Sequence, residues 1–225
     1  MASVGARREV VGAAAGGPAR CAPTFRAGAA ITESTRLLAA ATFAARQHRG
    51  QRRKGSLADP YINHPLQVAE LIARVGGHTE LQTLMAAILH DTVEDTDTEL
   101  EDIEREFGAE IAALVAEVTD DKSIPKSERK RLQVEHAPHL TPRAKVIKLA
   151  DKLCNVTDIG ADPPTWWEPE RMLGYFDWAD AVVAGLRGVN PALEALYDER
   201  VAASRAAVQA RVEEDAGKKK GKKRK

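Results

Sequence analysis

Apolar positions recur at helical spacing along most of the chain, and the alternation typical of strands is rare. This pattern predicts helices over residues 35–47, 81–91, 111–118, 126–135, 142–158, 169–186 and 191–213. Two more are expected, one opened by Pro65 and one running from Asp97 or Thr98 to Gly108, since proline suits a first helical turn and glycine a helix end. The prediction is an all-α fold, a single compact bundle of eight or nine helices.

Local signals refine two of these expectations. Ser34 is the predicted N-cap of the first helix, whose apolar residues at 37, 38, 41 and 45 are expected to face the core. Trp166 and Trp167 interrupt the pattern within the segment PPTWWEP, and both are predicted to pack in the core, with stacking on a base as the alternative.

The two ends of the chain differ in composition from its middle. Residues 1–30 are rich in Gly, Ala, Pro and Arg without periodicity, which predicts a disordered extension, with a transit peptide as the alternative. Residues 214–225 form a lysine-rich segment, predicted to be a disordered, solvated tail, with recruitment to nucleic acid or an anionic membrane as the alternative. The folded domain is therefore expected over residues 31–213.

Charge and cysteine content narrow the class of protein. The formal net charge is zero, but residues 31–216 carry 22 basic and 32 acidic residues. A folded body this acidic argues against broad nucleic-acid binding. No apolar stretch approaches the roughly 20 residues that span a bilayer. The two cysteines, Cys21 and Cys154, suggest no disulfide framework, so a reducing cytoplasm is expected, with Cys154 a small core residue.

The segment HDTVED, residues 90–95, carries the strongest chemical signal. His90 and Asp91 are both metal-binding types, and Glu94 follows them at the spacing of one helical turn. On a continuous helix these three side chains would face one pocket. Glu94 and Asp95 are then available to accept a proton from an activated water.

Two distant residues complete a possible metal shell. His64 precedes the predicted start of the second helix, and Asp151 lies between apolar residues in VIKLADKLCN. Taken singly, they are typical of a turn histidine and a surface acid. Together with His90 and Asp91, they give two imidazoles and two carboxylates, a set that suits a divalent first-row metal. A carboxylate between apolar runs needs a partner, and a metal supplies one.

A cluster of positive charge precedes His64. Arg52, Arg53 and Lys54 lie on the loop of residues 51–61, where they would offset the charge of a phosphorylated ligand, with Arg53 able to bind a phosphate through two nitrogens. Further candidates for ligand contact are Lys126, Lys130, Arg131 and Arg171, together with Tyr61 and Tyr175, which could stack on a base. A surface role is the alternative for these cations.

Four separated segments carry a resemblance to a known family. They are RRKGSLADPYINHP, LMAAILHDTVEDTDT, EVTDDKSIPKSERKRLQ and AKVIKLADKLCN. The chain between residues 33 and 190 resembles the HD-type hydrolase domain of the RelA/SpoT homologues, in particular the small alarmone hydrolases of the metazoan SpoT-homologue type. That resemblance implies an HD-domain fold and hydrolysis of the 3′-pyrophosphate of guanosine tetra- and pentaphosphate, releasing pyrophosphate and GDP or GTP.

The resemblance also implies roles for individual residues. His64, His90, Asp91 and Asp151 match the family's metal ligands, usually for manganese. Glu94 and Asp95 match its catalytic acidic pair. The positions that match its substrate contacts are Arg53, Lys54 and Asn155. The partner is then a small nucleotide.

The chain departs from the family pattern at two places. Thr157 stands where an arginine is frequent, which puts a local ion pair in doubt, although Asp158 is retained. The loop after Lys54 is slightly longer than in the long bifunctional enzymes, which again indicates the small type.

Three alternatives remain open. Small members of the family are also credited with removing a phosphate from NADPH. A different HD-type phosphohydrolase would act on other nucleotides. A binding module would sense an alarmone without cleaving it, which the retention of every ligand together with Glu94 and Asp95 argues against.

Overall fold

The described part of the chain is built from helices. The computed structural model describes residues 32–222, with side chains as far as Glu214, and the extension predicted at 1–30 lies outside these residues. Within them, the α-helices are α1 (Glu33–Gln47), α2 (Asn63–Arg74), α3 (Leu81–Leu89), α4 (Thr92–Asp95), α5 (Leu100–Phe107), α6 (Ala109–Val118), α7 (Lys126–His136), α8 (Pro142–Ala161), α9 (Pro169–Ala184) and α10 (Pro191–Lys222). The 3-10 helix η1 (Ala137–His139) precedes α8. The predicted all-α class is confirmed.

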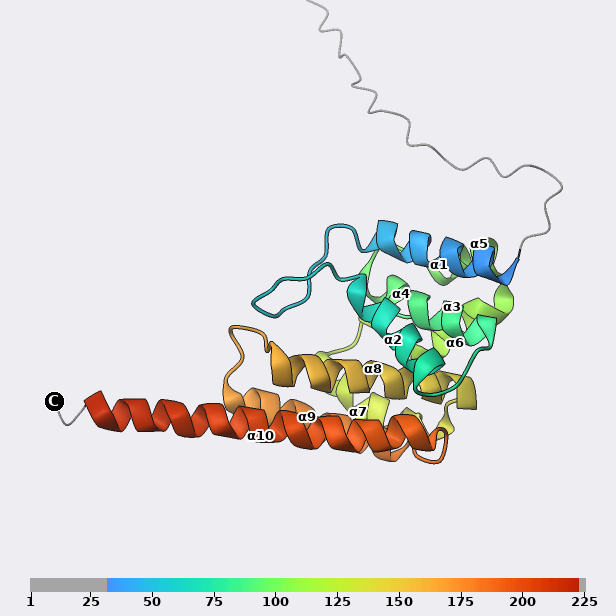
Figure 1. Ribbon diagram of the computed structural model, residues 1–225. Helices are drawn as coiled ribbons and strands as arrows, with labels where there is room; N and C mark the ends of the chain where they lie inside the picture. Colours follow the sequence, from blue (N-terminus) through green and yellow to red (C-terminus); the bar gives the residue numbers. More distant parts are fainter. Residues whose placement is uncertain (1–31, 223–225) are drawn as a thin grey trace, which may run out of the picture. The chain divides into compact units, whose positions relative to one another are not determined.

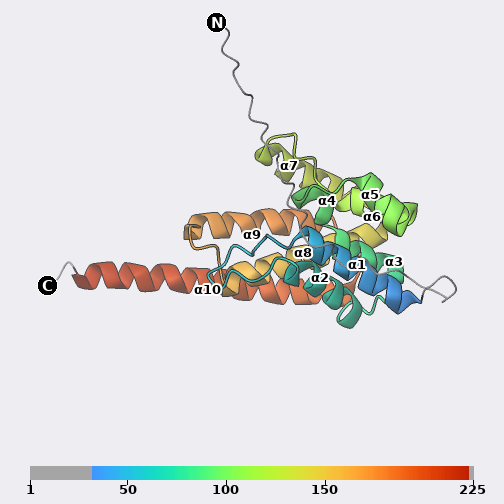
Figure 2. The ribbon, with the colours of Figure 1, turned by 90° about the horizontal axis from the view of Figure 1, so that it is seen from above.

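Helices α3 and α8 occupy the middle of this bundle (Figure 1). Helix α3 packs against α1, α2, α6 and α8, and α8 packs in addition against α6, α9 and α10. Figure 2 shows the same arrangement from above. Seven of the nine residues of α3 are buried, because a helix surrounded by neighbours has little surface left for solvent. The polar side chains on the core-facing side of α8, namely Lys148, Asp151 and Lys152, therefore lie in the interior.

The first helix begins earlier than the sequence predicted. Its N-cap is Thr32, whose Oγ1 accepts a hydrogen bond from the backbone N–H of Thr35 at 3.2 Å, so the prediction of Ser34 is wrong. Of the four positions expected to face the core, Leu37 and Ala41 pack partly against it, whereas Leu38 and Ala45 are exposed, so the expectation is wrong for these two. The fully buried residues of α1 are Ala40 and Ala44. The small residues face inward because α1 lies directly on α3.

Other helix boundaries moved by a few residues for local reasons. Helix α2 starts at Asn63, so Pro65 is its third residue and still lies in the turn that needs no proline N–H. Helix α5 starts only at Leu100, because Glu99 and Asp102 form a reciprocal capping box. Helix α8 runs to Ala161, α9 ends at Ala184, and α10 continues past residue 213 into the segment predicted as a tail.

The predicted helix over residues 81–91 is in fact interrupted. Helix α3 ends at Leu89, and the short helix α4 follows after His90 and Asp91. Two side chains take up the carbonyls of the last turn: His90 Nδ1 donates to the oxygen of Ala87 at 2.8 Å, and Thr92 Oγ1 donates to that of Leu89 at 2.7 Å. Such bonds compete with the backbone ladder and end the helix. This break accounts for the tenth helix.

The cationic loop between α1 and α2 closes on itself and on α8. Arg52 and Pro60 form an isolated antiparallel bridge. At the loop tip, the Asp162 carboxylate accepts hydrogen bonds from the backbone N–H groups of Ser56 at 2.9 Å and Leu57 at 3.1 Å. The loop is thus tied to the residue that caps the end of α8.

Cys154 and the two tryptophans test single-residue predictions. Cys154 is buried in α8 and unpaired, as expected of a small core residue. Trp167 packs partly against the core, but Trp166 is 59% exposed, so the prediction that it is buried is wrong.

Among the described residues, no helix combines the length and apolarity that crossing a bilayer requires.

Two helical glycines give a matched test of the packing of α8. A Cβ at Gly160 would lie 2.2 Å from Ser204 Oγ and 2.9 Å from the backbone Cα of Ser204, whereas a Cβ at Gly174 in α9 meets nothing within 4 Å. Gly160→Ala should lower the free energy of unfolding by about 1–3 kcal/mol through overpacking of α8 on α10. Gly174→Ala should raise it by about 0.5–1 kcal/mol, since alanine favours the helix. Denaturant unfolding measures both; equal effects would contradict the close α8–α10 contact.

Candidate active site

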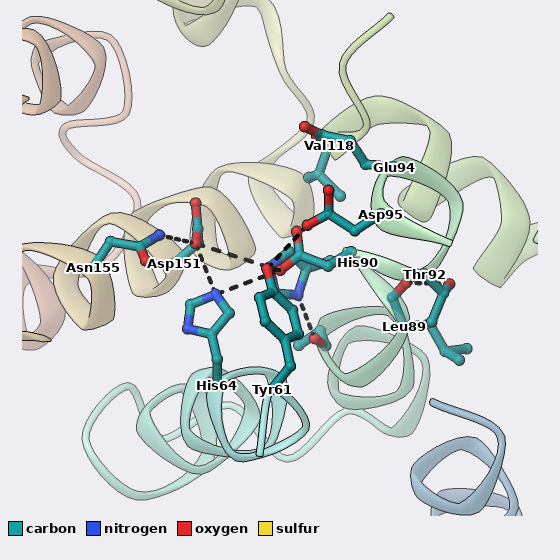
Figure 3. A network of polar contacts seen from close by, with 12 residues as sticks. Tyr61, His64, Leu89, His90, Thr92, Glu94, Asp95, Val118, Asp151 and Asn155 are labelled. Atoms are coloured by element: carbon teal, nitrogen blue, oxygen red, sulfur yellow. Dashed lines mark hydrogen bonds and ion pairs between the residues drawn. The ribbon is translucent and has the colours of Figure 1, made fainter. Parts of the chain in front are cut away.

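Three predicted ligands from three separate segments meet in one buried cluster. His64 comes from the first turn of α2, His90 from the break after α3, and Asp151 from the middle of α8. One ligand atom from each lies within 4.8 Å of the others (Figure 3). His64 Nε2 is 3.1 Å from Asp151 Oδ1, and His90 Nε2 is 3.8 Å from the same oxygen. The cluster could hold a metal ion.

Asp91 brings a second carboxylate to this cluster. Its Oδ2 lies 3.2 Å from His90 Nε2 and 3.6 Å from His64 Nε2. Asp91 follows His90 in the interruption between α3 and α4, and its carboxylate lies beside the His90 ring. The four predicted ligands are therefore brought together, although by a break in the helix and not by the continuous turn that the sequence suggested.

The donor set fits a divalent cation. His90 Nδ1 donates to the carbonyl oxygen of Ala87, which leaves Nε2 as the nitrogen that would bind a cation in place of a proton. That nitrogen is buried and has no hydrogen-bond partner among the described residues. A backbone carbonyl that fixes the imidazole in this way is typical of metal-binding histidines.

The electrostatics of the cluster also favour a cation. Burial by itself lowers the pKa of His90, but Asp91 and Asp151 outweigh it and raise that pKa to about 10. Although burial raises the pKa of a carboxyl group, His90 holds the pKa of Asp91 well below its ordinary value, and Lys152 does the same for Asp151. The two carboxylates therefore stay charged and attract positive charge to the space between them.

The predicted acidic pair lies at the edge of the same pocket. The pocket has a volume of about 160 Å³, and both Glu94 and Asp95 line it. Glu94 accepts a hydrogen bond from the backbone N–H of Asp120 at 3.3 Å, and Arg129 lies 3.8 Å away. Burial, followed by the negative charge of Asp120, raises the pKa of Glu94.

Asp95 is more firmly engaged than Glu94. Its Oδ1 forms an ion pair with Lys122, and its Oδ2 accepts a hydrogen bond from the hydroxyl of Tyr61 at 3.1 Å. Gln51 donates to its backbone carbonyl. Because both of its carboxylate oxygens are occupied, Asp95 is less suited than Glu94 to accept a proton.

The predicted phosphate-binding arginine is linked to the cluster through Asn155. Arg53 Nη2 donates to Asp158 Oδ2 at 2.7 Å and to Asn155 Oδ1 at 2.9 Å. Asn155 in turn donates to Asp151 Oδ1 at 2.6 Å. Asp158, the neighbour of Thr157, thus forms its ion pair with Arg53. Lys54, next in the chain, is exposed.

The remaining substrate candidates lie on α7 and α9. Burial lowers the pKa of Lys126, and the positive charges of Arg171 and Lys54 lower it further, so these three cations face a common space. Arg171 lies over the ring of Trp167, 4.5 Å from its centroid. Tyr175 packs beside Trp167, with ring centroids 5.8 Å apart. The substrate role of these residues stays a prediction.

Two lysines of the pocket were missed by the sequence analysis. Lys152 Nζ donates to Asp151 Oδ2 at 2.8 Å, and Lys148 Nζ donates to the carbonyl of Val118 at 2.8 Å. Both are buried and line the pocket. Their spacing of four residues inside the apolar run VIKLADKLCN was the available signal, since it places both on one face of the helix.

Comparison with known proteins gives the family. A family model described as an HD domain matches residues 40–171. The chain belongs to the HD-domain family. The matched residues include all four predicted ligands, the acidic pair and most of the predicted substrate contacts, and only Tyr175 lies outside them.

Individual relatives agree with this assignment. The chain is 55% identical over 163 residues to human guanosine-3′,5′-bis(diphosphate) 3′-pyrophosphohydrolase MESH1, which covers 72% of this chain and 91% of the human protein. Identity to the protein of the same name from Drosophila melanogaster is 49% over 166 residues, covering 74% of this chain and 93% of the fly protein. The predicted resemblance to the metazoan SpoT-homologue type is confirmed.

A solved structure matches the fold. It is described as a metazoan ortholog of SpoT that hydrolyzes ppGpp and plays a role in starvation responses. The superposition has a TM-score of 0.72 at 46% sequence identity and covers 79% of this chain and 96% of that one. The predicted HD-domain architecture is therefore confirmed.

Cation binding at the cluster can be measured without any substrate. Addition of Mn²⁺ to chelator-treated protein should raise the unfolding temperature, because a ligand that binds only the folded state adds about 2.7 kcal/mol at a hundred times its Kd. His90→Ala should abolish this shift, since it removes the free Nε2. The exposed His139 supplies the control, and His139→Ala should retain the full shift. An unchanged shift in His90→Ala would contradict the assignment of the cluster.

Proposed function

We propose that this protein is a metal-dependent (p)ppGpp 3′-pyrophosphohydrolase. The observation that carries the proposal is the convergence of His64, His90, Asp91 and Asp151 in one pocket with the acidic residue Glu94. The relatives named above carry this activity in their names. In the reaction, water attacks the phosphorus next to the ribose 3′ oxygen and the bond to that oxygen breaks. The products are pyrophosphate and GDP or GTP.

The proposed cofactor is Mn²⁺. Two imidazole nitrogens and two carboxylates form a mixed ligand set that first-row divalent ions share, so the choice of manganese rests on the family resemblance. When bound, such an ion supplies Lewis-acid chemistry, lowering the pKa of water and offsetting phosphate charge. His64, His90, Asp91 and Asp151 are the residues that would hold it.

Glu94 is the proposed proton acceptor. Its side chain is 22% exposed, and among the described backbone groups the N–H of Asp120 donates to its carboxylate, which leaves room to receive a proton. A raised pKa lies closer to neutral pH, and it makes the carboxylate a stronger base. Arg129, 3.8 Å away, can help to hold the carboxylate in place. Asp95, whose oxygens bind Lys122 and Tyr61, supports this arrangement.

Positive charge at the pocket mouth is the proposed source of substrate binding. Arg53 uses Nη2 for its contacts with Asn155 and Asp158, so Nη1 can still approach a phosphate oxygen. Lys54, Lys126 and Arg171 add point charges on the facing elements. In an otherwise acidic body, these groups would steer a substrate with several phosphates to the pocket.

The cytoplasm remains the proposed compartment. Cys154 is free and buried, and a structure that needs no disulfide is suited to reducing conditions.

The proposal predicts turnover of ppGpp by the full chain with Mn²⁺. Pyrophosphate and GDP should appear in equal amounts, and a chelator should stop the reaction. NADPH and deoxynucleotides belong in the same panel, because a 2′-phosphatase or another HD-type phosphohydrolase would prefer them. Binding of ppGpp without product after overnight incubation would overturn the proposal in favour of a sensor.

The role of Glu94 can be tested through the pH dependence of kcat/KM. A base works only when deprotonated, so activity should fall as pH drops through the pKa of Glu94. Asp120→Asn removes a negative charge that raises this pKa. The acid limb of the profile should therefore move to lower pH in that variant.

Two further variants complete this test. Glu94→Gln should lower turnover by about 10²–10⁴-fold while the Mn²⁺-induced thermal shift remains. Asp121→Asn changes a neighbouring exposed acid and should leave the acid limb where it is in the wild type. A limb that stays in place in Asp120→Asn, or moves to higher pH, would contradict the assignment of Glu94.

A further inference from the structure

Tyr61 touches both halves of the site at once. Its hydroxyl lies 2.7 Å from Oδ2 of Asp91. It also lies 3.1 Å from Oδ2 of Asp95 (Figure 3). The first carboxylate belongs to the cation cluster, and the second belongs to the acidic pair. Of the described hydrogen bonds, these are the ones that join the two groups through a single side chain.

The hydroxyl has only one hydrogen to share between these two acceptors. A phenol carries a single O–H, so it can be fully donated to one carboxylate at a time. Its nearer acceptor, Asp91 Oδ2, is also the oxygen that approaches His64 and His90. The charge at the cation cluster therefore influences which carboxylate accepts the hydrogen bond from Tyr61. That choice in turn affects the orientation of the Asp95 carboxylate.

The Tyr61 ring, which carries this hydroxyl, packs against His48. The two ring centroids lie 4.8 Å apart, and the ring planes are tilted by 33°. His48 Nδ1 donates to Gln51 Oε1 at 2.7 Å, and Gln51 Nε2 donates to the backbone carbonyl of Asp95. The same two residues thus fix the ring of Tyr61 and the backbone of its second acceptor.

Tyr61 also borders the cationic loop. The guanidinium of Arg53 lies 5.6 Å from its ring centroid, and the Tyr61 N–H donates to the carbonyl of Gln51 at 3.2 Å. Contacts therefore hold Tyr61 in place at its backbone, its ring and its hydroxyl. A side chain that orients other groups must itself be held in this way.

We propose that Tyr61 is a positioning residue, which orients the Asp91 carboxylate toward the cation and holds Asp95 beside it. Cation binding and turnover are thereby coupled through one hydroxyl. The turnover part rests on the proposed function, whereas the cation part stands without it. Loss of a residue that donates a hydrogen bond to a metal ligand typically lowers metal affinity or activity about 10- to 100-fold.

Tyr61→Phe tests this, because it keeps the ring against His48 and removes only the hydroxyl. The Mn²⁺ concentration giving half of the maximal thermal shift should rise about 10- to 100-fold. At saturating Mn²⁺, kcat for ppGpp should fall while KM changes little, since the phosphate-binding cations are untouched. A raised KM with normal kcat and normal Mn²⁺ binding would overturn the proposal.

Tyr197→Phe is the matched control. The Tyr197 hydroxyl donates to Asp180 at 2.8 Å, between α10 and α9, so the variant loses the same kind of bond outside the pocket. It should lower stability and leave the Mn²⁺ titration and kcat unchanged. If Tyr61→Phe behaves as this control does, Tyr61 has only a structural role and the proposal fails.

A double-mutant cycle with Asp95→Asn isolates the second contact. If Tyr61 acts through Asp95, the loss of kcat in the double variant should be smaller than the product of the two single losses. Independent losses would overturn the link to Asp95. A wild-type protein that binds Mn²⁺ but leaves ppGpp intact would refute the proposed function alone, and the Mn²⁺ titration of Tyr61→Phe would still decide the role of Tyr61 at Asp91.

Discussion

Asp91 and Asp151 place two carboxylates in the interior of a helical bundle, where an uncompensated charge is costly. Neighbouring polar groups offset this cost by donating hydrogen bonds to the two carboxylates. Lys152 pairs with one oxygen of Asp151, and Asn155 donates to the other. The hydroxyl of Tyr61 donates to Asp91. What remains is a space between two imidazoles and two carboxylates that a divalent cation can fill.

Helix α8 arranges these groups through its own periodicity. Lys148, Lys152 and Asn155 follow one another at spacings of four and three residues, so successive turns deliver polar side chains to the same side. Asp158 continues this row and reaches Arg53, while the capping residue Asp162 holds the tip of the cationic loop. One rigid helix therefore sets the distance between the predicted metal ligands and the cationic loop. A rigid element gives a site better precision than a loop alone would.

The acidic pair is divided by its surroundings into two unlike members. Glu94 has a raised pKa and few partners, whereas Asp95 is engaged by Lys122, Tyr61 and Gln51. Two carboxylates that differ in this way suit different tasks, one in proton transfer and the other in support. The loop between α6 and α7 contributes to both, since Asp120 contacts Glu94 and Lys122 contacts Asp95.

The sequence by itself determined the helical class, most helix positions and the residue types of the site. Periodicity and helix-end signals are local, and a charged residue within an apolar run is visible without a structure. Only the tertiary structure decided that the helix breaks at His90, that Arg53 pairs with Asp158, and that Tyr61 joins Asp91 to Asp95. Arg53 and Asp158 lie 105 residues apart in the chain, and no local pattern encodes such a contact. It exists because α2, α3 and α8 pack around one core and direct their polar side chains into the same pocket.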